Sequence, residues 1–183
     1  MVWEWVVLGA VVLAALVAVS YYNSIRVLSN QIENAWAQID VQLKKRNDLV
    51  PNLISTVKGY AKHETEAIKT VTEARAKMMG ATSTDAKVEA ANMMTGALKS
   101  ILALAENYPQ LRANENFLQL QEELSGIENK IAYARQFYND AVLSYNNLVT
   151  TIPGVWFAGV FNSKQHSMLA TPESERAVPK VQF

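Results

Sequence analysis

Two histidines and scattered carboxylates are the side chains of this 183-residue sequence with the clearest potential for chemistry. His63 is followed by Glu64 and Glu66, but no Glu stands three residues before it, and His166 lies far along the chain. A carboxylate-bridged di-metal site in a helical bundle needs a Glu-x-x-His motif that is repeated on facing helices. The sequence therefore predicts no metal site.

Other signatures of catalysis are also missing from the sequence. It has no Cys, no Gly-x-Ser-x-Gly and no glycine-rich phosphate loop, which are the usual marks of nucleophiles and nucleotide sites. The acidic group Glu115, Glu122 and Glu123 is typical of a solvent-facing surface near a helix start. We expect no catalytic residue, no cofactor and no enzyme activity.

The charge pattern excludes another class of function. The sequence has 17 basic and 17 acidic residues, interspersed rather than segregated. A nucleic-acid binder needs a basic face to neutralise phosphates. We therefore expect no nucleic-acid partner.

The N-terminal segment predicts a membrane anchor over residues of about 3–20. Residues 6–19 carry no charge, and a helix of about 18 to 20 apolar residues spans the roughly 30 Å hydrocarbon core. Aromatic residues flank this stretch on both sides, where they favour the membrane interfaces. The expected anchor residues are Trp3, Trp5, Leu8, Leu13, Leu16, Tyr21 and Tyr22.

A cleaved signal peptide is the main alternative to an anchor, because Ala18-Val19-Ser20 resembles a cleavage site. However, no Lys or Arg precedes the apolar run, and polar helical sequence follows it directly. We therefore favour an uncleaved single-pass anchor. Arg26 and the more distant Lys44, Lys45 and Arg46 favour an outside N-terminus and a cytoplasmic domain.

Hydrophobic periodicity predicts long helices after the anchor. From Phe117 to Ile152, apolar or aromatic residues recur with steps of three and four, which indicates a helix packed against neighbours. The expected helices are 21–47, continuous with the anchor as one rod, 49–79, 83–107 and 114–152. The expected core consists of Trp36, Leu43, Leu53, Val57, Phe117, Leu120, Leu124, Ile127, Ile131, Tyr138 and Tyr145.

These helices predict an all-α fold in which a transmembrane helix continues into a long antiparallel four-helix bundle. The expected divisions are an anchor over 1–22, a bundle over 23–152 and a tail over 153–183. Pro51 allows two predictions for the chain around it, because a proline is tolerated in the first turn of a helix but kinks the interior of a helix. We favour a tight reversal at Arg46-Asn47-Asp48 over a kinked continuous helix.

The tail and the amide side chains each leave two interpretations. The apolar segment 152–161 is expected to cap the end of the bundle, or to place Trp156, Phe157 and Phe161 against lipid or a second subunit. Asn and Gln residues beside the apolar stripe, including Asn139 and Asn146, are either surface groups or buried amides that fix helix register.

The sequence resembles the LemA family of bacterial membrane proteins over nearly its whole length. The resemblance is carried by Ala35-Trp36-Ala37-Gln38-Ile39-Asp40-Val41-Gln42-Leu43-Lys44-Lys45-Arg46, by residues 48–53, 57–60 and 74–75, and later by 113–117, 120–121, 123–124, 128–129, 134–135, 138–139 and 145–146. It implies an inner-membrane protein with its N-terminus outside, a cytoplasmic helical bundle and no known enzyme activity. Relatives include a protein of magnetosome membrane formation. The pair Trp156-Phe157 is more aromatic than the family pattern suggests.

Two functional hypotheses follow. The first is a membrane-anchored scaffold that self-associates and organises or remodels the bilayer. The second is an adaptor that docks a protease or signalling partner through the bundle surface. We favour the scaffold, with the lipid bilayer and further copies of the chain as partners.

Overall fold

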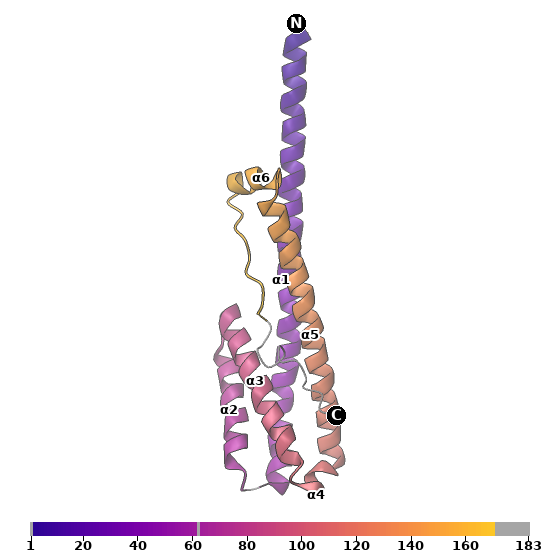
Figure 1. Cartoon of the computed structure of the whole chain (residues 1–183), viewed down its shortest axis with the longest axis vertical. Coiled ribbons are helices and arrows are strands. Elements are labelled where there is room, and N and C mark those ends of the chain that lie inside the picture. Colours follow the sequence, from indigo (N-terminus) through magenta and orange to yellow (C-terminus); the bar gives the residue numbers. More distant parts are fainter. Residues whose placement is uncertain (1, 62, 171–183) are drawn as a thin grey trace, which may run out of the picture. The chain divides into compact units, whose positions relative to one another are not determined.

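The computed structural model describes residues 2–61 and 63–170 and is built of helices, with no strand among these residues. The helices are α1 (Val2–Tyr60), α2 (Thr65–Gly80), α3 (Thr84–Ala105), α4 (Pro109–Arg112), α5 (Glu115–Thr150) and α6 (Gly154–Val160) (Figure 1). This confirms the all-α class and the long apolar N-terminal helix. The antiparallel four-helix arrangement and the divisions after residues 22 and 152 stay predictions.

The chain forms two compact units, which we describe separately. The first, here called the N-terminal unit, combines the chain up to Gln38 with Ala134–Leu169, and the second, the central unit, contains Ile39–Tyr133. Both α1 and α5 contribute to each unit because each helix continues across the boundary between them.

The core of the central unit is built from five helices, α1 to α5, with Leu111 as the contribution of α4. Leu53 of α1, Val71 of α2, Ile101 of α3 and Phe117 of α5 are almost completely buried in one apolar cluster. Local capping fixes where two of these helices begin. The Ser83 Oγ accepts a hydrogen bond from the Ala86 N–H at 3.2 Å, and Asn114 Oδ1 accepts one from the Phe117 N–H at 3.0 Å, as expected for N-cap residues.

Of the predicted core residues, Trp36 and Leu120 are half-buried. The others are buried, and they are Leu43, Leu53, Val57, Phe117, Leu124, Ile127, Ile131, Tyr138 and Tyr145. Trp36 and Tyr138 meet edge to face within the N-terminal unit, with ring centroids 6.0 Å apart.

The expected reversal at Arg46-Asn47-Asp48 is wrong, because α1 continues through Pro51 to Tyr60. The single helix expected over 49–79 is instead the last part of α1, which ends at Tyr60, followed by α2, which begins at Thr65.

The reason is an apolar stripe that crosses the proline. Val50, Leu53 and Val57 are all buried on α1, and each buried side chain of this size contributes about 1.5 to 3 kcal/mol. Together these contributions exceed the roughly 3 kcal/mol cost of a proline inside a helix. The Pro51 ring is itself exposed, so it displaces no core residue.

Candidate functional site

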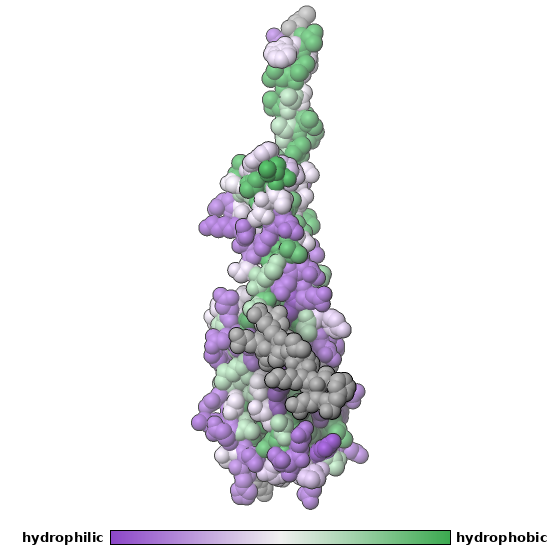
Figure 2. All heavy atoms as spheres, viewed as in Figure 1, coloured by the Kyte–Doolittle hydropathy of each residue, from purple (hydrophilic) through white to green (hydrophobic). Residues whose placement is uncertain are grey.

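The N-terminal part of α1 exposes an apolar surface on all sides. Residues 2–17 are exposed, and Figure 2 shows apolar side chains covering the visible face of this segment. Among the described residues, α1 is the one helix that is long and apolar enough to cross a membrane, and none of its most apolar stretch is buried. Membrane anchors and signal sequences share this character.

Helix α6 packs against α1 at the end of this apolar stretch. The Tyr21 and Phe157 rings are stacked with centroids 4.9 Å apart, and Tyr22 meets Phe161 edge to face at 5.2 Å. The three tail aromatics are therefore placed differently, because Phe157 and Phe161 face α1 whereas Trp156 is 64% exposed. Contact of these residues with lipid or a second subunit stays a prediction.

The exposed side of α6 is apolar. Ile152, Val155, Trp156 and Val160 are exposed together on or beside this short helix, and we call this set the α6 face. A contiguous apolar patch on a protein surface usually marks a binding surface.

Gly154 allows α6 to approach α5 closely. A Cβ atom at this position would clash with the Leu148 carbonyl oxygen and would lie 3.4 Å from the Tyr21 ring. Gly159, in the same helix, has nothing within 4 Å of such an atom. The direction of the chain after α5 therefore depends on residue 154 being a glycine, which has no side chain.

Two asparagines of α5 bind the backbone of the tail segment that follows α6. The Asn146 amide donates to the His166 carbonyl and accepts from the His166 N–H, both at 2.9 Å. Asn139 pairs in the same way with Leu169, at 3.1 and 2.8 Å. Seven residues of helix span about 10.5 Å and three extended residues span about 10 Å, so the two spacings match. We call this arrangement the asparagine clamp.

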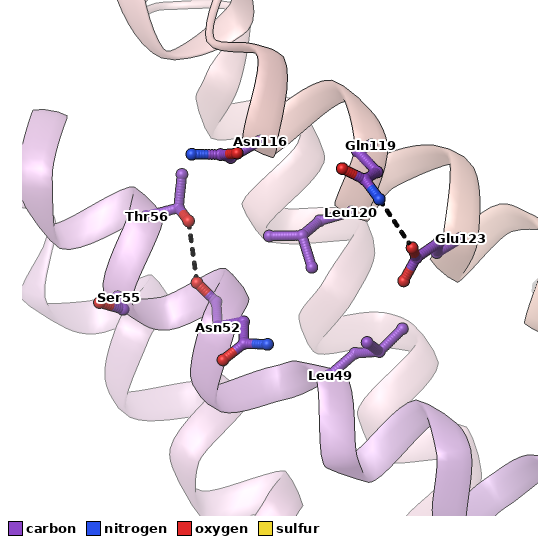
Figure 3. A pocket seen from close by; sticks show the side chains of 8 residues that line it. All are labelled: Leu49, Asn52, Ser55, Thr56, Asn116, Gln119, Leu120 and Glu123. Atoms are coloured by element: carbon purple, nitrogen blue, oxygen red, sulfur yellow. Dashed lines mark hydrogen bonds between the residues drawn. The ribbon is translucent and has the colours of Figure 1, made fainter.

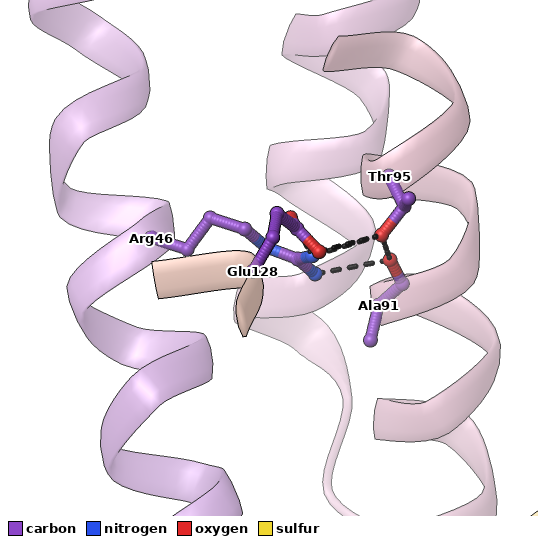
Figure 4. Close-up of polar contacts among 4 residues, drawn as sticks. All are labelled: Arg46, Ala91, Thr95 and Glu128. Carbon is purple, nitrogen blue, oxygen red and sulfur yellow. Dashed lines mark hydrogen bonds and ion pairs between the residues drawn. The ribbon is translucent and has the colours of Figure 1, made fainter. Parts of the chain in front are cut away.

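The central unit contains a buried charged group that the sequence reasoning did not single out. Arg46 is 1% exposed, and its guanidinium donates to Glu128 Oε1 at 2.6 Å, Thr95 Oγ1 at 2.9 Å and the Ala91 carbonyl at 3.0 Å (Figure 4). The Thr95 hydroxyl in turn donates to the same carbonyl at 3.1 Å. This network ties α1, α3 and α5 together.

The periodicity of α1 contained a signal for this arginine. Arg46 stands three residues after Leu43 and four before Val50, which is the step pattern of the buried stripe. A charged residue at a core position needs a paired partner. Glu128, four residues after Leu124, lies beside the stripe of α5 and supplies that partner.

The central unit also has a shallow pocket lined by amides, with a volume of about 390 Å³. Asn52, Ser55 and Thr56 of α1 face Asn116 and Gln119 of α5, with Leu120 pointing into the space between them (Figure 3). The two asparagine side chains make no hydrogen bond to the part of the chain that the structure describes. These amides are therefore surface groups, whereas Asn139 and Asn146 are engaged in the clamp.

Two polar contacts shift the pKa values of groups in the central unit. The Tyr108 hydroxyl donates to Glu64 at 2.9 Å, and this hydrogen bond to a carboxylate raises the pKa of Tyr108. The Lys77 ammonium, 2.6 Å from Glu89, lowers the pKa of that carboxyl through a hydrogen bond and its charge.

The residues first considered for metal chemistry do not assemble. His63 and Glu64 lie in the loop after α1, where Glu64 is held by Tyr108, and His166 lies in the tail of the other unit. Within residues 2–61 and 63–170, no three His, Cys, Asp or Glu side chains converge to hold a metal ion.

Comparison with known proteins decides the family. The model of the LemA family matches residues 35–183, which is most of the chain. The chain belongs to the LemA family. It is 26% identical over 123 residues to Protein LemA from Metamycoplasma hominis, a match that covers 67% of this chain and 56% of that relative. The range matched by the family model contains Arg46, Glu128, Asn139, Asn146 and Gly154.

We predict that removing the partner of the buried arginine costs more than removing the pair. Glu128→Ala should lower the free energy of unfolding by about 2 to 3 kcal/mol, because Arg46 is left charged and buried, while part of Glu128 reaches water. The double variant Arg46→Met with Glu128→Leu should be less destabilised than Glu128→Ala. Chemical denaturation of the full chain in mild detergent measures both. A double variant that loses as much stability as Glu128→Ala, or more, would contradict the prediction.

We also predict that Gly154→Ala lowers the free energy of unfolding of the N-terminal unit by about 1 to 3 kcal/mol, because the new methyl group meets the Leu148 carbonyl. Gly159→Ala is the matched control and should have little effect. Protection of the tail from limited proteolysis, together with the thermal midpoint, measures the difference. Equal behaviour of the two variants would show that α6 is not constrained at Gly154.

Proposed function

We propose that this LemA-family protein is a single-pass, membrane-anchored helical scaffold that self-assembles and organises or remodels the membrane. The observation that carries the proposal is the exposed apolar segment of α1, which is one uninterrupted helix with the part that enters the central unit. At about 25 cal/mol per Å² of apolar surface, leaving this segment in water is unfavourable. A bilayer removes that cost.

The α6 face supports a role at the membrane surface. Helix α6 packs on Tyr21 and Tyr22, where α1 would leave the hydrocarbon core and where aromatic residues are favoured. There the α6 face would lie against headgroups and upper acyl chains. A short apolar helix inserted in one leaflet occupies area in that leaflet alone, which is a route to membrane remodelling.

The orientation proposed is an outside N-terminus with the central unit in the cytoplasm of a bacterial cell. Arg26 and the basic residues 44–46 follow the apolar segment, whereas no Lys or Arg precedes it. The role is proposed as structural and not enzymatic, with the bilayer and further copies of the chain as partners.

The anchor is tested by extracting membranes that contain the full chain at alkaline pH and measuring the intact mass of the retained protein. We expect the chain to remain in the membrane with residues 1–20 present, because α1 spans the bilayer. A mature protein that begins after Ser20, or one that is released by the extraction, would overturn the anchor.

Assembly is tested by the mass of the particle in mild detergent. Trp156→Ala should reduce membrane deformation or assembly at least severalfold without loss of helicity, because the ring is exposed and supports no core. Tyr133→Ala removes an exposed aromatic from the central unit and serves as the control. A strictly monomeric protein would refute self-assembly, and unchanged assembly and lipid contact in Trp156→Ala would refute the role of the α6 face.

An adaptor that docks a protease or signalling partner is the alternative function. The amide-lined pocket between α1 and α5 favours it, because unpaired amides can bind a partner's backbone. Crosslinking in cells separates the two proposals. Contacts between copies of the chain alone support the scaffold, whereas a second protein crosslinked at Asn52 or Asn116 supports the adaptor.

A further inference from the structure

A groove lies beside α1 immediately after the apolar segment. It has a volume of about 590 Å³ and is lined by Tyr22, Arg26 and Ser29 of α1, by Tyr145 of α5 and by the tail at residues 161–166. All of these residues belong to the N-terminal unit. The volume lies within the range of small-molecule sites in proteins.

Three basic side chains line this groove, and no acidic side chain does. Arg26 enters from α1, and Lys164 and His166 enter from the tail. Within the ranges that the structure describes, neither Arg26 nor Lys164 forms an ion pair. Hydroxyl groups of Tyr22 and Ser29 add further donors. Converging cationic and hydroxyl donors are suited to a phosphate group.

The asparagine clamp fixes the wall of the groove that carries Lys164 and His166. Asn146 holds the His166 backbone by two hydrogen bonds, and the imidazole meets the Tyr145 ring edge to face at 4.8 Å. At the other end of this wall, the Ser163 N–H donates to the Ala158 carbonyl at 2.9 Å. The backbone of the tail on both sides of Lys164 and the His166 ring are therefore held in place, and neither the Lys164 ammonium nor the Arg26 guanidinium is used in these contacts.

The level of the groove relative to the membrane favours a lipid as the source of the phosphate. Arg26 stands four residues after Tyr22, which is about 6 Å along a helix. The interfacial region on each side of the hydrocarbon core is roughly 5 to 8 Å thick. If Tyr22 marks the edge of the core, Arg26 reaches the level of the lipid phosphates.

We propose that this groove binds the phosphodiester of an anionic phospholipid, as in phosphatidylglycerol. The inference rests on the proposed membrane anchoring and names the ligand that the anchored chain holds at its surface. A zwitterionic headgroup is disfavoured because its ammonium group would enter a groove that has no carboxylate to receive it. An anionic headgroup brings no ammonium group, and its phosphate pairs with Arg26 and Lys164.

The experiment is native mass spectrometry of the full chain in detergent with added phosphatidylglycerol or phosphatidylcholine of identical acyl chains. The wild-type chain should retain phosphatidylglycerol in preference. Arg26→Ala and Lys164→Ala should each weaken its binding about fivefold, and the double variant more strongly, as expected for loss of one basic contact at a time. Lys99→Ala and Lys130→Ala remove equal charge from exposed sites in the central unit and should bind normally.

Three outcomes would overturn the inference. These are equal retention of the two lipids, equal weakening in the control variants, and inorganic phosphate that binds as tightly as the lipid, which would identify a free phosphate as the ligand. Circular dichroism confirms that each variant is folded. A chain that stays in the membrane on alkaline extraction but shows no lipid preference refutes the groove alone, whereas a chain that is released refutes the anchor.

The clamp provides a second, independent variant. Asn146 touches no lipid in this proposal and acts as a positioning residue. Asn146→Ala should reduce phosphatidylglycerol retention severalfold and leave phosphatidylcholine retention unchanged. Asn129→Ala removes an exposed amide of the same helix from the central unit and should have no effect. Normal lipid preference in Asn146→Ala would show that the clamp does not organise the groove.

Discussion

The burial of one face of α1 on both sides of Pro51 is the constraint on which the central unit depends. Because Leu43, Val50 and Leu53 must lie on one side, the helix cannot reverse at the proline without exposing part of this stripe. The helix therefore continues to Tyr60, and α2 begins only at Thr65. The position of α2 follows from that continuation, because its buried residues close over the end of the α1 stripe.

The same constraint explains the buried arginine. A helix that continues through residue 46 with an unchanged stripe carries the side chain of that residue into the core. The charge is tolerated because a carboxylate, a hydroxyl and a carbonyl accept hydrogen bonds from the guanidinium. Few other arrangements of α3 and α5 would supply all three acceptors. Polar pairing of this kind specifies one register between helices, although it adds little net stability.

Much of the fold could be predicted from the sequence, because the strongest signals are periodic. The stripe that begins at Phe117 predicted a helix over 114–152, and α5 extends over Glu115–Thr150. The reversal at Arg46 was predicted wrongly because a local rule about proline was weighed above the stripe that crosses it. The stripe extends over several turns and buries several side chains, whereas the rule concerns a single hydrogen bond.

The candidate sites were less accessible to sequence reasoning. Trp156, Phe157 and Phe161 were noted as a group, but which of them face α1 depends on the turn after α5. The clamp partners of Asn139 and Asn146 are backbone groups 30 and 20 residues away, respectively, and backbone groups leave no pattern in a sequence. The close approach at Gly154 is likewise set by the path of the chain and not by residue type.

The asparagine clamp has a consequence for which residues of the tail of this protein can change. Each asparagine bonds only to peptide groups of the tail, so these four hydrogen bonds do not depend on the side chains of His166 and Leu169. Residues 167 and 168, which lie between the clamped positions and are exposed, can change without loosening the segment. Changes at these two positions therefore alter the surface chemistry of the tail while its hydrogen bonds to α5 stay in place.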